Sequence, residues 1–344
     1  MKAVVLIAAF ALVWGAAIFI KAQDSPLPTI PQAPPPTNAP ASPVRTTNNI
    51  DFTIGPNYAD APELQVRPNV PQGTLYDFVM KSEESKIYPG IAKGHTNEVV
   101  PYRRKVCVYV PQNYKRGTPA PFIVAQDGLN YRRILPTILD NMIFDHRLPP
   151  MIAIMINSGG GDSKGSERGL EYDTVSGTYA TFIETEVLPR LTRDYHLAFT
   201  TDPNGRATMG GSSGGAAAFS MAWFHPELYR LVLSHSGTFV NQQSPVNTNT
   251  PHGAWEYHEH LIPQSDPKPI RVWLQVSQFD NGYAQVEVNL HNWVLANQRM
   301  EEALKAKGYS YRYVFAEDAK HNDSRVVRQT LPGALEWLWQ DYPR

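Results

Sequence analysis

The sequence contains a single cysteine, Cys107, in a chain of 344 residues. One cysteine cannot form an internal disulfide, and a cysteine-ligated metal site needs several thiolates, so neither feature is expected. Cys107 lies inside the apolar run KVCVYV, where a buried small side chain is the expected role and a catalytic thiol is not.

The chain also has no excess of charge of either sign. Its 31 Lys and Arg residues against 32 Asp and Glu residues give a net charge of −1. A balance of this kind offers no broad attraction to nucleic acid or to anionic membranes, so neither is an expected partner. The one basic run, YRRK at residues 102–105, directly precedes an apolar strand pattern and is interpreted as its solvated flank.

A long hydrophobic run stands at the N-terminus, where Lys2 precedes 18 uncharged residues, 3–20. This layout predicts a signal peptide over residues 1–22, or an uncleaved membrane anchor, and hence a secreted or periplasmic protein. Residues 24–45 hold eight prolines, so residues 23–48 are predicted to be a disordered linker. A single folded domain is expected at residues 49–344.

Within that domain, short apolar runs alternate with helical patterns. Strands are predicted at residues 105–110, 120–126, 151–157, 206–210, 230–237, 270–276 and 311–317, and helices at 178–195, 214–224, 290–307 and 331–340. Several of the strands are apolar throughout, as strands covered on both faces should be. The pattern predicts an α/β fold with a mostly parallel central sheet and helices on both faces.

The stretch RATMGGSSGGAAAF, residues 206–219, lies where a predicted strand meets a predicted helix. It lacks the lysine of a phosphate loop and the spacing of a dinucleotide fingerprint. The pattern G-x-S-x-G, which presents a nucleophilic serine on a tight strand-to-helix turn, fits it twice, with Ser212 or Ser213 as the nucleophile. The frame centred on Ser212 leaves the shorter turn after the strand and is favoured.

Such a serine needs an acid and a base from loops after later strands, in the chain order Ser, acid, His. Asp280 follows the strand pattern IRVWLQV, and His321 follows the last strand, 41 residues further on. His235 is the rival base, although it lies inside a strand pattern. The rival acids, Glu317, Asp318 and Asp323, are too near His321 in sequence to come from a separate loop.

An oxyanion hole would take one amide from Ser213 and another from the loop after an early strand, at Leu129 or Gly128. An ordinary turn at Gly128 is the alternative. His258 and His260 lie one residue apart without a clear third ligand, so no metal site is expected, and no organic cofactor is implied.

Six segments, in chain order, resemble the putative-esterase branch of the α/β-hydrolases: FIVAQDG, RGLEYDT, TMGGSSGGAAAF, LSHSGTF, RVWLQVSQFDNG and AKHND. That branch includes enterochelin esterases, S-formylglutathione hydrolases, feruloyl and acetylxylan esterases, and mycolyltransferases. The resemblance runs from about Gly73 to the C-terminus. It implies an α/β-hydrolase fold, an elbow serine at Ser212, and an acid and base at Asp280 and His321.

The resemblance also singles out Arg168, Glu171 and Tyr172, which match an arginine and a Glu-aromatic pair of the branch. They are expected either to bind substrate or to order a loop. The segment VSQFDNG departs from the branch, where a glycine or an acidic residue often follows the LQ pair.

The expected function is therefore cleavage of a carboxylic ester by a serine esterase through an acyl-enzyme. The expected substrate is a small-molecule, siderophore or carbohydrate-linked ester of the acetyl or feruloyl type. An acyltransferase of the same fold and a non-catalytic binding module are the alternatives. Four aromatic residues could line an aryl or sugar pocket or could pack in the core: Tyr131, Trp255, Tyr257 and Trp293.

Overall fold

The computed structural model describes residues 50–91, 99–160 and 166–344. The expected signal peptide or anchor at residues 1–22 and the expected linker at residues 23–48 lie outside these ranges. Within them, no helix combines the length and the apolar character needed to cross a bilayer.

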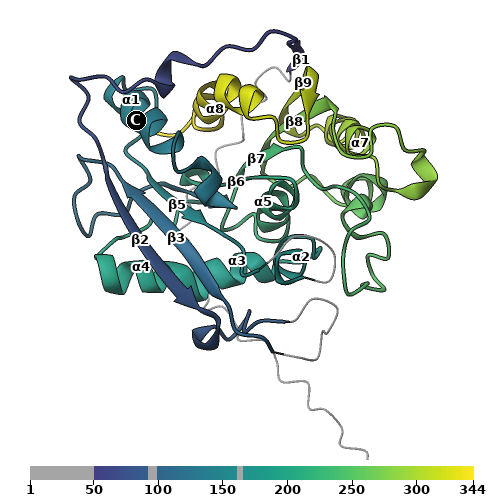
Figure 1. Cartoon of the computed structure of the whole chain (residues 1–344), viewed down its shortest axis with the longest axis horizontal. Helices are drawn as coiled ribbons and strands as arrows, with labels where there is room; N and C mark the ends of the chain where they lie inside the picture. Colours follow the sequence, from purple (N-terminus) through teal and green to yellow (C-terminus); the bar gives the residue numbers. More distant parts are fainter. Residues whose placement is uncertain (1–49, 92–98, 161–165) are drawn as a thin grey trace, which may run out of the picture. The chain divides into compact units, whose positions relative to one another are not determined.

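Nine strands form one sheet in the described part of the chain (Figure 1). Their bounds are β1 Ile50–Ile54, β2 Thr74–Lys81, β3 Arg103–Val110, β4 Phe122–Gln126, β5 Ile152–Ile156, β6 Arg206–Gly211, β7 Leu231–His235, β8 Arg271–Phe279 and β9 Ser310–Lys320. The order across the sheet is β1-β9-β8-β7-β6-β4-β5-β3-β2.

The sheet is parallel except at the β2 end, where β2 pairs antiparallel with β3 and β3 antiparallel with β5. Strands β4, β5, β6 and β7 are buried along their whole length, which explains their unbroken apolar runs. The expected class, a mostly parallel α/β sheet, is confirmed. Two strands were missed, β1 and β2, because both are edge strands with little continuous apolar sequence.

Helices connect the parallel strands. Their bounds are α1 Leu135–Phe144, α2 Glu167–Tyr172, α3 Thr178–Phe182, α4 Leu188–Tyr195, α5 Ser213–Phe224, α6 Ile262–Gln264, α7 Trp293–Ala306 and α8 Ser324–Leu338, with π-helical turns at Ile183–Val187 and Tyr257–Leu261. The helix predicted at 178–195 is thus α3 and α4 joined by a π turn. The last helix begins earlier than predicted, at Ser324, because the Asp323 side chain accepts a hydrogen bond from the Arg325 amide and caps it.

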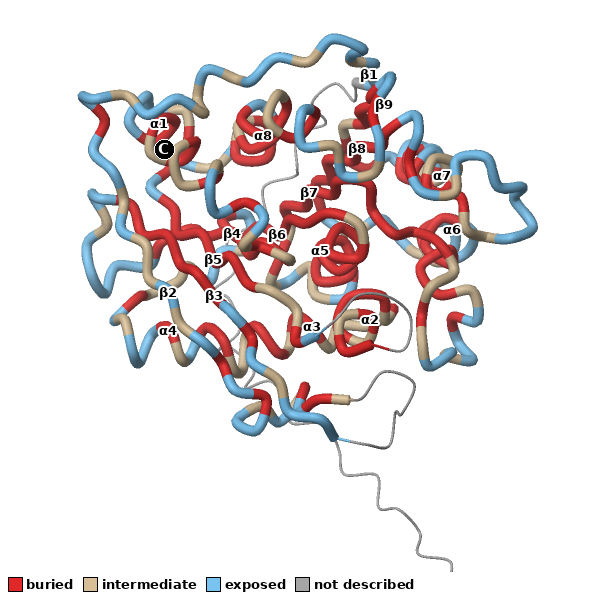
Figure 2. The backbone as a smooth tube through the Cα atoms, in the orientation of Figure 1, coloured by how far each residue is buried: buried red, intermediate tan, exposed pale blue. Residues whose placement is uncertain are grey.

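The sheet separates two hydrophobic layers. On one side, α1 and α8 pack on side chains such as Leu139, Met209 and Leu335. On the other, α3, α4, α5 and α7 pack on a larger core around Phe219 and Val232. Helix α5 follows β6 directly and is buried on all sides except at its last residue (Figure 2). The turn between β6 and α5 is therefore rigidly held at the carboxyl edge of the sheet.

Candidate active site

Ser212 occupies the turn between β6 and α5 in a strained backbone conformation, with φ 57° and ψ −129°. Such a conformation is rare for a residue with a Cβ atom and persists only where its surroundings enforce it. A Cβ atom on Gly210 would lie 2.4 Å from the backbone of Gly214, so position 210 must be glycine for the strand and the helix to approach this closely. The local sequence therefore creates the turn that presents Ser212.

The two adjacent serines have different environments. Ser212 is partly exposed and lines a pocket, whereas Ser213 is the first residue of α5 and is buried. Oγ of Ser213 accepts a hydrogen bond from Gln242 Nε2 at 3.4 Å. Ser212, the serine favoured from turn length, is thus accessible from the pocket, whereas the side chain of Ser213 is buried.

His321 and Asp280 meet although 41 residues separate them in the chain. Nδ1 of His321 lies 2.5 Å from Oδ1 of Asp280, and His321 lines the same pocket as Ser212. Asp280 is buried, while the imidazole keeps 22% of its side-chain surface exposed. Since Nδ1 is bound to Asp280, Nε2 is the imidazole nitrogen that is left to act as a base.

Three further hydrogen bonds fix the Asp280 carboxylate. Its Oδ2 accepts hydrogen bonds from Ser236 Oγ at 2.6 Å and from the Ser277 amide at 3.2 Å, and its Oδ1 accepts one from the Asn281 amide at 2.8 Å. A buried carboxylate with this many donors is held in one orientation. Ser236, which follows β7, is a positioning residue that the sequence analysis did not identify.

The rival groups are placed elsewhere. Glu317 and Asp318 are exposed, and Asp323 caps α8. His235 is buried, and burial lowers its pKa to about 3, so its imidazole stays neutral and packed. His258 is also buried, and desolvation lowers its pKa to about 3. Neither histidine lines the pocket.

The hydroxyl of Ser212 points to Thr238, with the two oxygen atoms 3.3 Å apart. Thr238 Oγ1 also accepts a hydrogen bond from Nε1 of Trp293 at 3.2 Å. Nε2 of His321 has Nδ2 of its neighbour Asn322 at 3.4 Å. The Ser212 hydroxyl is thus paired with Thr238 here, and catalytic hydrogen bonds often tighten only when substrate binds.

The predicted oxyanion donors come from two places, the start of α5 and the loop after β4. The amide of Ser213 begins α5, where helix geometry supplies no acceptor. The amide of Leu129 donates a hydrogen bond to Oδ1 of Asn157 at 3.2 Å. Gly128 packs against β5, where a Cβ atom would lie 2.4 Å from Met155 Cα. Asn157, which follows β5, is a partner of this loop that the sequence analysis missed.

The pocket that contains Ser212 and His321 has a volume of about 550 Å³ and is half open. That size is typical of a small-molecule site. Its described lining residues are Asp127, Asn130, Tyr131, Arg133, Ile134, Arg168, Gly211, Ser212, His321, Asn322, Ser324, Val327 and Arg328. Of the four aromatic residues considered from sequence, only Tyr131 lies in this lining; Trp255, Tyr257 and Trp293 are buried packing residues.

Helix α2 carries Arg168, Glu171 and Tyr172, the three residues that the resemblance singled out. Only Arg168 lines the pocket, and the other two are buried. Arg168 lines the pocket, where its guanidinium binds Oδ2 of Asp127 at 2.7 Å. Tyr172 is buried, and its hydroxyl accepts a hydrogen bond from the Asp127 amide at 3.2 Å. Asp127 itself has a left-handed backbone, with φ 49°. Arg168 and Tyr172 therefore order the loop after β4, and Tyr172 does not reach the pocket.

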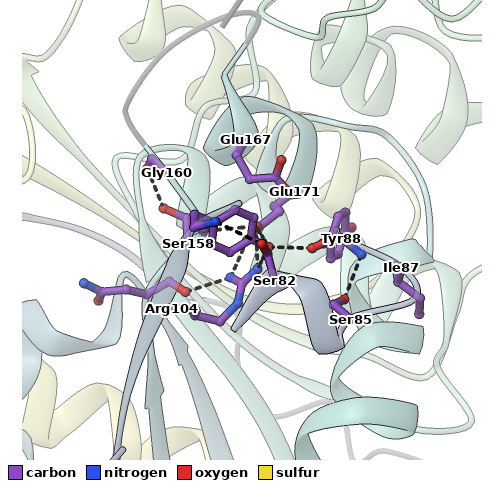
Figure 3. A network of polar contacts seen from close by, with 12 residues as sticks. Ser82, Ser85, Ile87, Tyr88, Arg104, Ser158, Gly160, Glu167 and Glu171 are labelled. Atoms are coloured by element: carbon purple, nitrogen blue, oxygen red, sulfur yellow. Dashed lines mark hydrogen bonds and ion pairs between the residues drawn. The ribbon is translucent and has the colours of Figure 1, made fainter. Parts of the chain in front are cut away.

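Glu171 lies deeper, in a buried polar network with Arg104 (Figure 3). The two Glu171 oxygens each lie 2.6 Å from one guanidinium nitrogen of Arg104, a paired geometry of high strength. Tyr102 and the amide of Gly159 add hydrogen bonds to the same carboxylate. Glu171 is thus a structural residue that joins α2 to β3, and the loop-ordering interpretation fits it better than substrate binding.

Glu167, one turn before Glu171 on α2, gives the protein a pH-dependent stability. Burial, with repulsion from Glu171, raises the pKa of Glu167 to about 7 from an ordinary value of 4.5. Because the folded-state pKa is the higher one, the stabilisation is present below about pH 4.5 and is lost as the pH rises through about 7. We expect the free energy of unfolding to fall by roughly 2–3 kcal/mol from pH 5 to pH 8 on this account.

Urea unfolding at several pH values tests this expectation. In Glu167→Gln the side chain is uncharged at every pH and has nearly the shape of protonated Glu167. The variant should therefore remove most of the dependence of the free energy of unfolding on pH. Glu186→Gln is the matched control, since Glu186 accepts hydrogen bonds from the Lys86 and Ile87 amides and should leave that dependence unchanged. Parallel stability curves for the wild type and Glu167→Gln would show that Glu167 is not the group responsible.

Comparisons with known proteins give one family and a set of similar folds. The family described as "Putative esterase" matches residues 98–338. No curated protein sequence matches the chain. Solved structures match in fold at low identity, and three of them illustrate the range.

The enterobactin esterase from Shigella flexneri, in a complex with 2,3-dihydroxy-N-benzoyl-glycine, is 17% identical, with a TM-score of 0.56 over 81% of this chain and 62% of that one. The ferric enterobactin esterase from Salmonella typhimurium is 20% identical, with a TM-score of 0.55 over 79% of this chain and 62% of that one. The chain therefore spans about three fifths of the length of these two proteins. A ferulic acid esterase from Anaeromyces mucronatus, in complex with ferulic acid, is 12% identical, with a TM-score of 0.57 over 81% of this chain and 95% of that one.

Proposed function

The chain belongs to the family of putative esterases, and from that premise we propose that it is a serine carboxylic-ester hydrolase that works through an acyl-enzyme. The observation that carries the proposal is the convergence of three side chains from three loops. Ser212 on its strained turn and His321 open on one pocket, and Asp280 is buried behind His321 at 2.5 Å. These three residues occur along the chain in the order Ser, Asp, His, which is the order found in α/β-hydrolases.

In this mechanism His321 takes the proton of the Ser212 hydroxyl through Nε2 as the oxygen attacks the ester carbonyl carbon. The Asp280 carboxylate keeps the Nδ1 proton in place and stabilises the imidazolium that forms. His321 then returns the proton to the leaving alcohol oxygen, and the acyl group stays on Ser212. A water molecule, deprotonated by His321, attacks the acyl-enzyme and releases the acid.

The negative charge of the tetrahedral intermediate needs two amides. The amide of Ser213 supplies one, and the loop at Gly128 and Leu129 supplies the other. The Leu129 amide already donates to Asn157, so substrate must compete with that side chain or displace it. Removal of one such donor typically raises the barrier by about 3–4 kcal/mol.

The pocket favours an ester with a negatively charged group. Three arginines line it, against one aspartate. Arg168 is paired with Asp127 and Arg328 with Asp60, while Arg133 makes no ion pair within the described residues. An enterobactin esterase and a ferulic acid esterase share this fold, and an ester that carries a free carboxylate fits the positive charges of this pocket.

Replacement of Arg133 tests the substrate class. For Arg133→Gln we expect KM for an ester with a free carboxylate, such as p-nitrophenyl hydrogen succinate, to rise about threefold to tenfold, the effect of one partly exposed charge pair. KM for neutral p-nitrophenyl acetate should not change. Arg132→Gln is the matched control, because Arg132 lies outside the pocket and pairs with Asp77. Equal effects of both changes, or of one change on both esters, would contradict the assignment.

The activity itself is tested with the full chain on p-nitrophenyl acetate and methyl ferulate. Turnover of at least one ester supports the hydrolase, and turnover of neither overturns it. An acyltransferase is the alternative within the same fold, and it would deliver the acyl group to an added alcohol or sugar in preference to water. A non-catalytic binding module would bind such esters without turning them over.

The protein is proposed to act outside the cytoplasm, as a secreted or periplasmic enzyme. The support is the N-terminal sequence, Lys2 followed by an apolar run, together with the Pro-rich stretch after it. A small-molecule or glycan ester is the proposed partner, with membrane contact only if the N-terminal segment is retained.

A further inference from the structure

Three metal-ligating side chains, His252, Glu256 and Glu259, gather between β7 and β8, outside the pocket of Ser212, and His260 lies beside two of them. His252 precedes the 3-10 turn Gly253–Trp255, and Glu256 directly follows that turn. Glu259 and His260 lie on the π-helical turn Tyr257–Leu261. We propose that these four residues bind one divalent transition-metal ion, for which Zn²⁺ is the best match.

Three distances between ligand atoms are close to the edge of a zinc tetrahedron. Nδ1 of His252 lies 3.4 Å from Oε1 of Glu256 and 3.5 Å from Oε2 of Glu259. Nδ1 of His260 lies 3.8 Å from Oε2 of Glu259. Zinc bonds to nitrogen and oxygen of about 2.0–2.1 Å make the edge of the tetrahedron about 3.4 Å long. A fourth pair, His260 Nδ1 and Glu256 Oε2, is closer, at 2.6 Å, and forms a hydrogen bond that an ion would replace.

Two observations at this cluster point to a bound cation. Nδ1 of His252 is buried and makes no hydrogen bond, although it faces two carboxylates. Glu256 is only 6% exposed and directs one oxygen to each histidine. A cation at the centre would give the unpaired nitrogen a bond and would neutralise the buried carboxylate.

The donor set indicates which ion fits. Two imidazoles and two carboxylates are ligands for zinc and for other first-row transition metals, whereas calcium and magnesium prefer oxygen ligands alone. Four ligands from the protein would close the coordination sphere, so the site is structural, not catalytic.

The tertiary structure supplies the ligands that the sequence did not reveal. His258, considered with His260 from their spacing, is buried against Trp255 and does not join the cluster. Glu256 takes its place because it lies four residues after His252 and four before His260, and residues at that spacing share one helix face. The proposal therefore departs from the sequence-based expectation that His258 and His260 lack a third ligand.

The ion would tie down the segment that packs beside the catalytic serine. Upstream of His252 on that segment, Gln242 donates to Asp173 Oδ2 at 2.9 Å and to Ser213 Oγ at 3.4 Å. Gln243 accepts a hydrogen bond from the Val175 amide at 2.7 Å. A bound ion would link the end of this segment at His252 to the helical turn Tyr257–Leu261. We therefore expect the ion to raise the stability of the folded chain.

Titration with ZnCl2 tests the proposal. The full, untagged chain is stripped with EDTA, and Zn²⁺ is added in calorimetry and in thermal unfolding. We expect one ion per chain and a rise of several degrees in Tm, because a ligand that binds only the folded state stabilises it. His252→Ala and Glu259→Gln should weaken binding at least about 10- to 100-fold, the loss that even an outer-shell defect causes.

Both histidines are nearly half exposed, 44% and 47%, so their replacement should leave the fold intact. The control is His225→Ala, which removes another His–Glu pair, His225 Nδ1 to Glu227 Oε1 at 2.8 Å. It should keep wild-type zinc binding. Absence of saturable binding in the wild type, or equal affinity in wild type and His252→Ala, overturns the proposal.

Discussion

Ser212→Ala is expected to abolish ester turnover, with a loss of about 10⁶-fold in kcat. Without the hydroxyl there is no acyl-enzyme, and His321 and Asp280 have no proton to move. Alanine keeps the Cβ atom of serine, so the strained backbone at φ 57° is unchanged and the fold should be as well. The measurement is kcat for p-nitrophenyl acetate, together with the burst of p-nitrophenol that an accumulating acyl-enzyme gives in the wild type.

Ser213→Ala is the matched control for this prediction. Its hydroxyl is buried and bonds only weakly to Gln242, and its amide, the proposed oxyanion donor, is retained in alanine. We expect kcat within about tenfold of the wild type, the scale of one modest hydrogen bond. If Ser213→Ala were inactive and Ser212→Ala active, the elbow would be centred on the other serine.

Asp280→Asn is expected to lower kcat about 10⁴-fold while the fold is retained. Both oxygens of Asp280 accept hydrogen bonds from backbone amides, one from Ser277 and one from Asn281. An asparagine must therefore turn its NH₂ group toward one of these donors or toward His321. If it turns toward His321, the imidazole is held in the wrong tautomer, and Nε2 carries the proton it should accept.

The control for this second variant is Asp323→Asn, at a carboxylate only two residues from His321. Asp323 caps α8 and pairs with Arg325, and it makes no contact with the imidazole. We expect a small loss of stability and nearly unchanged kcat/KM for p-nitrophenyl acetate. A large loss of kcat in Asp323→Asn, with Asp280→Asn active, would reassign the acid.

Much of the site was readable from local sequence because its parts depend on neighbours in the chain. The glycines around Ser212 are needed wherever a strand turns sharply into a helix, and a Cβ at Gly210 would collide with Gly214. Asp280 and His321 each follow a strand whose apolar run is visible in the sequence. The carboxyl ends of parallel strands lie along one edge, so their association follows from the fold class.

Other features could not be predicted because they arise from contacts between distant segments. Thr238 and Ser236 look like ordinary loop residues, yet one touches Ser212 and the other touches Asp280. Asn157, which follows β5, accepts a hydrogen bond from the amide of Leu129, which follows the neighbouring strand β4. Helix α2 was not predicted, since it is short and buries Glu167 and Glu171 instead of an apolar face.

The sequence by itself determined the α/β alternation, the strained serine turn and the order of serine, acid and base, since each follows from short-range sterics and apolar periodicity. The tertiary structure decided which side chains reach the pocket, which carboxyl is buried with a raised pKa, and which histidine pairs with Glu256. These depend on packing that excludes water from some polar groups and leaves others exposed, and packing is fixed only when segments far apart in the chain come together.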